Sequence, residues 1–175
     1  MQALTDAIRT LEAFLDQGGI LMYAIAALTL WMWVLIFERL VYFKGSLKGD
    51  IQQSLAQWES RKERKSWNAH QIRTALVSRM DDKISSNLDM ITALVALCPL
   101  MGLLGTVTGM IEVFSVLANT GGADAKSMAG GVSKATIPTM AGMVAAISGV
   151  FASTYLTRIA DNEKALFADH LTMDH

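Results

Sequence analysis

The 175-residue sequence contains one cysteine and two prolines, and its longest apolar stretches contain no charged residue. A single cysteine forms no intrachain disulfide, and with three scattered histidines it makes no metal-binding pattern. No phosphate-binding loop, nucleophile motif or paired-carboxylate arrangement is present either. We therefore expect no catalytic residue, no cofactor and no metal, and the protein is not expected to be an enzyme.

Three charge-free stretches instead dominate a chain that is 52% hydrophobic. They cover residues 20–37, 90–111 and 135–157. A helix rises about 1.5 Å per residue, so about 20 residues cross the ~30 Å hydrocarbon core of a bilayer. The sequence therefore predicts an all-α membrane protein with three transmembrane helices.

Basic residues predict the orientation of these helices. Nine of the fifteen Lys and Arg residues lie between Lys44 and Lys83, and positive charge is typical of cytoplasmic segments. Because topology explains the basic cluster at 61–65, nucleic acid is not an expected partner. We expect a periplasmic amphipathic interfacial helix over 1–18, transmembrane helix 1 over 19–43 and a cytoplasmic helical region over 44–88. Transmembrane helix 2 should follow over 89–118 and a periplasmic loop over 119–127. Transmembrane helix 3 is expected over 128–158 and a cytoplasmic tail over 159–175.

The second and third helices are expected to be long and to extend into the cytoplasm. Apolar residues recur every three or four positions from Ile72 to Val95, which favours one continuous helix over about 69–118. The third helix should begin near Lys126 or Ser127 and end near Ala168. A short amphipathic helix is expected over 50–60.

Small residues at helix-packing spacing mark both of these spans. Residues four apart let two backbones approach closely, and packing is the main force between helices in lipid. The two prolines lie inside spans, where they predict kinks. The expected packing residues are Gly102, Gly105, Gly109, Gly142 and Gly149, and the expected kinks are at Pro99 and Pro138.

Hydroxyls and two charges supply the remaining polar groups of the spans. An intramembrane hydroxyl usually bonds a carbonyl of its own helix, but Thr106, Thr136 and Thr139 together could line a lumen. The expected pore-lining residues are these three threonines with Glu112 and Lys134. Glu112 and Lys134 are costly at depth. Either they snorkel to the outer interface or, if Thr106 and Thr139 lie level, they differ in depth by only ~1.5 Å and form an ion pair.

The stretch Pro99-Leu-Met-Gly-Leu-Leu-Gly-Thr-Val-Thr-Gly-Met110, followed by Ala135-Thr-Ile-Pro-Thr-Met-Ala-Gly-Met-Val-Ala-Ala-Ile147, resembles the ExbB/TolQ/MotA proton-channel family, and most of all a short ExbB. The resemblance implies a pentamer in a bacterial inner membrane. Its lumen would be lined by Thr106 and Thr139, and would hold the single helices of ExbD-like partners. Proton flow would then energise TonB-dependent uptake across the outer membrane.

Two departures from the family pattern affect this reading. Family members usually have a glutamate where this chain has Lys134, and commonly a neutral residue where it has Glu112. A TolQ-like subunit of an envelope-maintenance motor and a non-conducting membrane scaffold are the alternatives. The sequence also leaves open the stoichiometry, the nutrient served and whether the ion is a proton or sodium.

Overall fold

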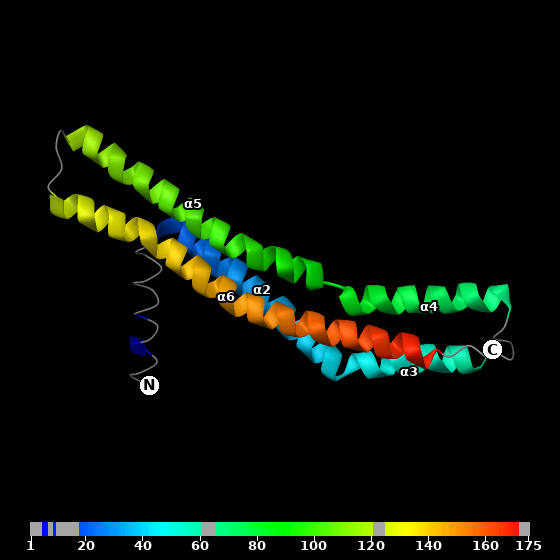
Figure 1. Cartoon of the computed structure of the whole chain (residues 1–175). Coiled ribbons are helices and arrows are strands. Elements are labelled where there is room, and N and C mark those ends of the chain that lie inside the picture. Colours follow the sequence, from blue (N-terminus) through cyan, green and yellow to red (C-terminus); the bar gives the residue numbers. More distant parts are fainter. Residues whose placement is uncertain (1–4, 7–8, 10–17, 61–65, 121–124, 172–175) are drawn as a thin grey trace. The chain divides into compact units, whose positions relative to one another are not determined.

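The computed structural model describes residues 5–6, 9, 18–60, 66–120 and 125–171. Its secondary structure is helical throughout this part of the chain, in five long helices (Figure 1). These are α2 (Gly19–Lys44), α3 (Ser46–Glu59), α4 (Trp67–Ser85), α5 (Leu88–Thr120) and α6 (Ala125–His170). The interfacial helix expected over 1–18 lies almost wholly outside the described residues.

Three helical stretches are long and apolar enough to cross a membrane: Gly19–Lys44, Trp67–Asn119 and Met128–His170. This confirms the expected all-α membrane class with three membrane-length helices. The third helix extends over nearly the range expected for it, and the amphipathic helix expected over 50–60 is α3.

The expected continuous helix over 69–118 is wrong, because Ser86 and Asn87 separate α4 from α5. Asn87 adopts a φ of 63°, in the left-handed region that interrupts a right-handed helix. Its side-chain amide donates a hydrogen bond to the Glu38 carboxylate at 3.0 Å. Asparagine tolerates this conformation better than most residues. One residue can therefore end the helix while the apolar residues on either side keep their helical spacing.

The chain divides into two compact units, and the boundary falls within α2, α5 and α6. Unit 1 comprises Met1–Trp33 and Ala93–Val150. Its core is formed by small and flexible apolar side chains from all three helices, which suit close helix packing: Met22, Ile25, Met32, Leu94, Val95, Cys98, Ala135, Ala145 and Ala146.

Unit 2 comprises Val34–Thr92 and Phe151–His175. Larger side chains fill its core, and every helix that enters the unit contributes to it. The large buried side chains are Ile36, Leu47, Trp58, Met80, Ile84, Ile91, Leu156, Phe167 and Leu171. Ala69 and Ala160 are buried among them. This bulky core differs from that of unit 1, where alanines and glycines allow backbones to approach.

Arginine side chains bind two helix ends in unit 2. Arg39 is only 5% exposed, and its Nη1 donates to the Lys83 carbonyl near the end of α4. Arg73 donates from Nε to the Leu171 carbonyl at 2.8 Å and from Nη2 to the Ala168 carbonyl at 3.0 Å. The last carbonyls of a helix lack helical donors and carry partial negative charge. Each arginine therefore stabilises a helix end that the backbone leaves unsatisfied.

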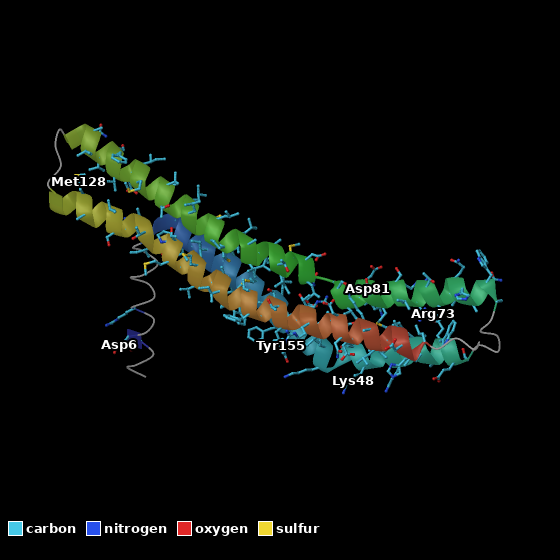
Figure 2. All side chains as sticks on the ribbon, viewed as in Figure 1. Asp6, Lys48, Arg73, Asp81, Met128 and Tyr155 are labelled. Atoms are coloured by element: carbon cyan, nitrogen blue, oxygen red, sulfur yellow. The ribbon has the colours of Figure 1, made fainter. Side chains whose placement is uncertain are left out.

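Polar pairs also connect the helices of unit 2. Asp81, which lies on α4 like Arg73 (Figure 2), accepts from Lys164 of α6 at 2.8 Å. Asp50 of α3 accepts from the Tyr42 hydroxyl at 2.8 Å and from Lys83 Nζ at 3.1 Å. These two hydrogen bonds, with that from Tyr42 the larger effect, lower the pKa of the Asp50 carboxyl from its ordinary value of 3.8.

Replacement of Asn87 should distinguish backbone conformation from side-chain bonding. In Asn87→Val, a β-branched residue must adopt the left-handed conformation, and we expect a loss of about 1–2 kcal/mol in the free energy of unfolding. Asn87→Gly loses the bond to Glu38 but adopts this φ without strain, so it should lose less. Thermal unfolding followed by circular dichroism in detergent measures both. Equal losses would show that the Glu38 bond, and not the backbone, controls the break.

Acidification should weaken the contacts of Asp50. A carboxyl with a lowered pKa stabilises the folded state at pH values above its ordinary pKa, and this contribution disappears as the pH falls through the lowered value. The unfolding midpoint should therefore decline as the pH falls below the ordinary value of 3.8, by an amount corresponding to less than ~1 kcal/mol for a partly exposed group. Asp50→Asn should make this part of the profile flatter, and an unchanged profile would contradict the assignment.

Candidate functional site

The helices α5 and α6 are brought together by glycines that leave no space for a side chain. A Cβ added to Gly102 would lie 2.8 Å from Thr139 Cα, and one added to Gly105 would lie 2.5 Å from Pro138 Cβ. At Gly109 the nearest atom would be Ala135 Cβ, at 2.6 Å. Real Cβ atoms do not approach other atoms this closely, so the separation of the two helices depends on these three glycines.

The same contact continues toward the C-terminal end of α6. A Cβ on Gly142 would lie 2.5 Å from the Cys98 carbonyl oxygen, and one on Gly149 would lie 2.6 Å from both Met32 Sδ of α2 and Val95 Cγ2 of α5. Gly149 is therefore the position where three helices of unit 1 meet. All five glycines singled out from the sequence lie at helix contacts.

The paired residues define an antiparallel register between α5 and α6. Gly102 lies against Thr139, Gly105 against Pro138 and Gly109 against Ala135. Thr139 also donates its hydroxyl proton to the Gly102 carbonyl at 2.8 Å, across the two helices. The ion-pair hypothesis for Glu112 and Lys134 was conditional on Thr106 and Thr139 lying level. The register instead places Thr139 level with Gly102, one turn away from Thr106.

The three threonines proposed for a lumen share one chemical property. The hydroxyls of Thr106 and Thr136 donate to carbonyls of their own helices, Leu103 at 2.7 Å and Ser133 at 2.8 Å. With Thr139 bonded to Gly102, all three hydroxyl protons are engaged. A hydroxyl has one proton and two lone pairs, so each of these oxygens can still accept a hydrogen bond. Beyond the chain itself they therefore present acceptors rather than donors.

Glu112 and Lys134 line one pocket of about 360 Å³ in unit 1. Its walls come from the first turn of α2, from α5 and from α6, and they are mostly glycine and apolar side chains. Both charged residues are exposed, and no ion pair joins them among those that the structure shows for the described residues. The pocket thus contains an acid and a base on facing helices that do not form a salt bridge.

The register offsets the two charges along the helix axes. Contacts at Gly109–Ala135 and Val113–Gly131 place Glu112 approximately level with residue 131 or 132. Lys134 therefore lies two or three residues further along α6, which corresponds to about 3–4.5 Å of depth. The expected difference of ~1.5 Å was too small because it assumed that Thr106 and Thr139 are level.

Both prolines lie inside helices, Pro99 in α5 and Pro138 in α6. A proline has no N–H, so the carbonyl four residues earlier loses its helical donor. For Pro138 this carbonyl belongs to Lys134, which lines the pocket. Pro138 also fills the space above Gly105, so it contributes to packing as well as to the helix backbone.

The sequence argument missed part of this site. Gly131 faces Val113, whose Cγ2 would lie 2.5 Å from an added Cβ, and Thr108 and the segment Gly18–Leu21 line the pocket. Gly131 and Ala135 are four apart, so the small-residue pattern already contained a signal for the first. The α2 segment had no such signal, because its place in the pocket depends on tertiary packing.

Comparison with known proteins relates most of the chain to one family. The MotA/TolQ/ExbB proton channel family matches residues 44–169. A biopolymer transport protein of the ExbB-like kind from Synechocystis is 39% identical over 82 residues, which cover 45% of this chain and 32% of that protein. The biopolymer transport protein ExbB of Xanthomonas campestris is 33% identical over 91 residues, covering 52% and 36%. That of Helicobacter pylori is 35% identical over 78 residues, covering 45% and 54%.

The matched segments therefore span about a third to about half of these relatives' own lengths. No solved structure matches the chain.

A methyl group at Gly105 should separate α5 from α6. Gly105→Ala places a Cβ against the rigid Pro138 ring, and overpacking of this kind costs about 1–3 kcal/mol. Gly130→Ala is the matched control, because a Cβ on Gly130 of α6 meets nothing within 4 Å. Thermal unfolding should show a lower midpoint for Gly105→Ala and little change for Gly130→Ala. A similar response in both variants would show that the glycine contact is not tight.

Proposed function

The chain belongs to the MotA/TolQ/ExbB proton channel family, and we propose that it is an ExbB-like subunit of a proton-driven motor in a bacterial inner membrane. The match over residues 44–169 is the observation that carries this proposal. In the proposed assembly several copies of the chain, five by analogy with the family, surround a lumen. Single-span ExbD-like subunits occupy the lumen, and a TonB-like protein transmits the work to outer-membrane uptake.

The threonine oxygens support a path for protons. In the proposed assembly Thr106, Thr136 and Thr139 face the lumen, and their own protons are held by backbone carbonyls. Their free lone pairs accept hydrogen bonds from hydronium or from a protonated carboxyl group. A row of acceptors stabilises a positive charge and offers nothing to an anion, which favours cation transfer.

The close contact of α5 and α6 gives these oxygens a fixed support. The Thr139 hydroxyl is held by its hydrogen bond to the Gly102 carbonyl, and the Gly102 backbone packs against the Thr139 backbone. A site built on rigid elements keeps its geometry better than one on a mobile loop. Rigid α5–α6 pairs, repeated around the lumen, would form the stationary part of the motor while the partner helices move.

Orientation follows from the charge distribution. The basic segment between Lys44 and Lys83 is placed in the cytoplasm by the positive-inside rule, and the polar contacts of unit 2 suit an aqueous location. The pocket at the outer parts of α5 and α6 then lies toward the periplasm, as would the interfacial helix expected over 1–18. A TolQ-like role in envelope maintenance uses the same chemistry and differs only in the partner.

Replacement of two threonines by valine tests the proposal. Thr106→Val and Thr139→Val keep the shape and remove the acceptor oxygens. Because a hydrogen bond to a charged group is worth about 1.5–3 kcal/mol, each should lower proton flux by about tenfold or more. The full chain with its single-span partner is reconstituted in liposomes, and flux is followed with an internal pH dye. Thr108→Val serves as the control, because the Thr108 hydroxyl also bonds its own helix but Thr108 is not among the threonines proposed to face the lumen.

The outcomes separate the candidate functions. A non-conducting scaffold would retain partner binding and full function in the valine variants, and would show no flux in the unmodified protein. Flux driven by a sodium gradient and absent with a proton gradient alone would assign sodium as the ion. Loss of assembly in the Thr139 variant would show that its bond to Gly102 is structural.

A further inference from the structure

The pocket between the first turn of α2, α5 and α6 has walls that suit an amphipathic molecule. Its lining is largely apolar, with Val113, Val116, Leu117 and Met128 toward the ends of α5 and α6 that face the connecting loop. Among the described residues of the lining, Glu112 and Lys134 carry the charge. An acyl chain fits the first feature, and a charged headgroup fits the second.

The two charges favour a ligand that carries both signs. Glu112 and Lys134 line the same pocket without an ion pair between them, and an unpaired charge within a membrane-spanning helix is costly. A purely anionic ligand would pair with Lys134 and leave Glu112 beside its negative charge. A zwitterion neutralises both groups together.

The positions of the groups match one headgroup in particular. The register separates Glu112 and Lys134 by about 3–4.5 Å along the helix axis. In phosphoethanolamine the ammonium lies two carbons from the phosphate ester, and this ammonium has three N–H donors for a carboxylate. The first turn of α2 lines the same pocket, and it adds the positive end of a helix dipole, which favours the phosphate.

We propose that this pocket binds a phosphatidylethanolamine molecule of the bilayer, with its ammonium on Glu112, its phosphate on Lys134 and an acyl chain along the apolar wall. This site is separate from the proton path, because the pocket lining includes none of Thr106, Thr136 and Thr139. The bound lipid neutralises both charges and fills the space that the first turn of α2, α5 and α6 enclose.

Lipid selectivity tests the proposal. The purified full chain with its partner is delipidated in detergent and titrated with phosphatidylethanolamine, phosphatidylcholine or phosphatidylglycerol, and bound lipid is counted by native mass spectrometry. Phosphatidylcholine keeps the phosphate but has no N–H donor, and phosphatidylglycerol has no cation. Phosphatidylethanolamine should bind about tenfold more tightly than either, as expected for one charge-assisted hydrogen bond.

Variants connect the selectivity to the pocket. Glu112→Gln should abolish the preference for phosphatidylethanolamine, and Lys134→Met should weaken the binding of all three lipids. The double variant Glu112→Lys with Lys134→Glu exchanges the two charges and should regain most of the preference. Asp161→Asn and Lys48→Met remove the same charges from exposed positions outside the pocket and should change nothing.

Several results would overturn the proposal. Equal binding of the three lipids by the unmodified protein would do so, as would a preference that persists in Glu112→Gln. If a second copy of the chain or the N-terminal segment fills the pocket, no lipid will show binding that depends on Glu112 and Lys134. Circular dichroism and the size of the purified assembly show whether each variant is folded.

Discussion

The close approach of α5 to α6 is the constraint on which unit 1 depends. At Gly102, Gly105 and Gly109 a single added carbon would lie within 3 Å of the opposite helix. In a bilayer no hydrophobic driving force brings two apolar helices together, so the gain comes from packing and from interhelical hydrogen bonds. The bond from Thr139 to the Gly102 carbonyl supplies one of these. It forms because neither backbone is held away by a side chain.

This contact also sets the positions of the groups proposed to act. Once Gly105 lies against Pro138 and Gly109 against Ala135, the depths of Thr106, Glu112 and Lys134 follow from the helix rise. The pocket containing the two charges forms where α5 and α6 meet the first turn of α2. Packing, the acceptor row and the charged pocket are therefore consequences of one register.

Unit 2 obtains its stability differently. Its core contains bulky side chains such as Trp58 and Leu156, and its helix ends are bound by the guanidinium groups of Arg39 and Arg73. Arg39 is 5% exposed, and a buried guanidinium needs hydrogen-bond partners. The Lys83 carbonyl at the end of α4 supplies one for Nη1 at little cost, because the helix itself leaves this carbonyl free, whereas Nε is buried without a hydrogen-bond partner among the described residues. The same contact binds the end of α4 close to the break at Asn87.

The sequence by itself determined the three membrane-length helices, because long charge-free stretches have few other structures available in lipid. It also identified the glycines that meet at the helix contacts, since small residues four apart share a helix face. Tertiary structure decided the register of α5 and α6 and hence the separation of Glu112 from Lys134. If α5 slides along α6 by one helical turn, small residues still face small residues, so the sequence pattern does not distinguish these registers. The packing of the two helix surfaces selects one of them. Tertiary structure also decided the helix break at Asn87. There a residue in the left-handed conformation, bonded to Glu38, ends the helix although the apolar periodicity of the sequence continues.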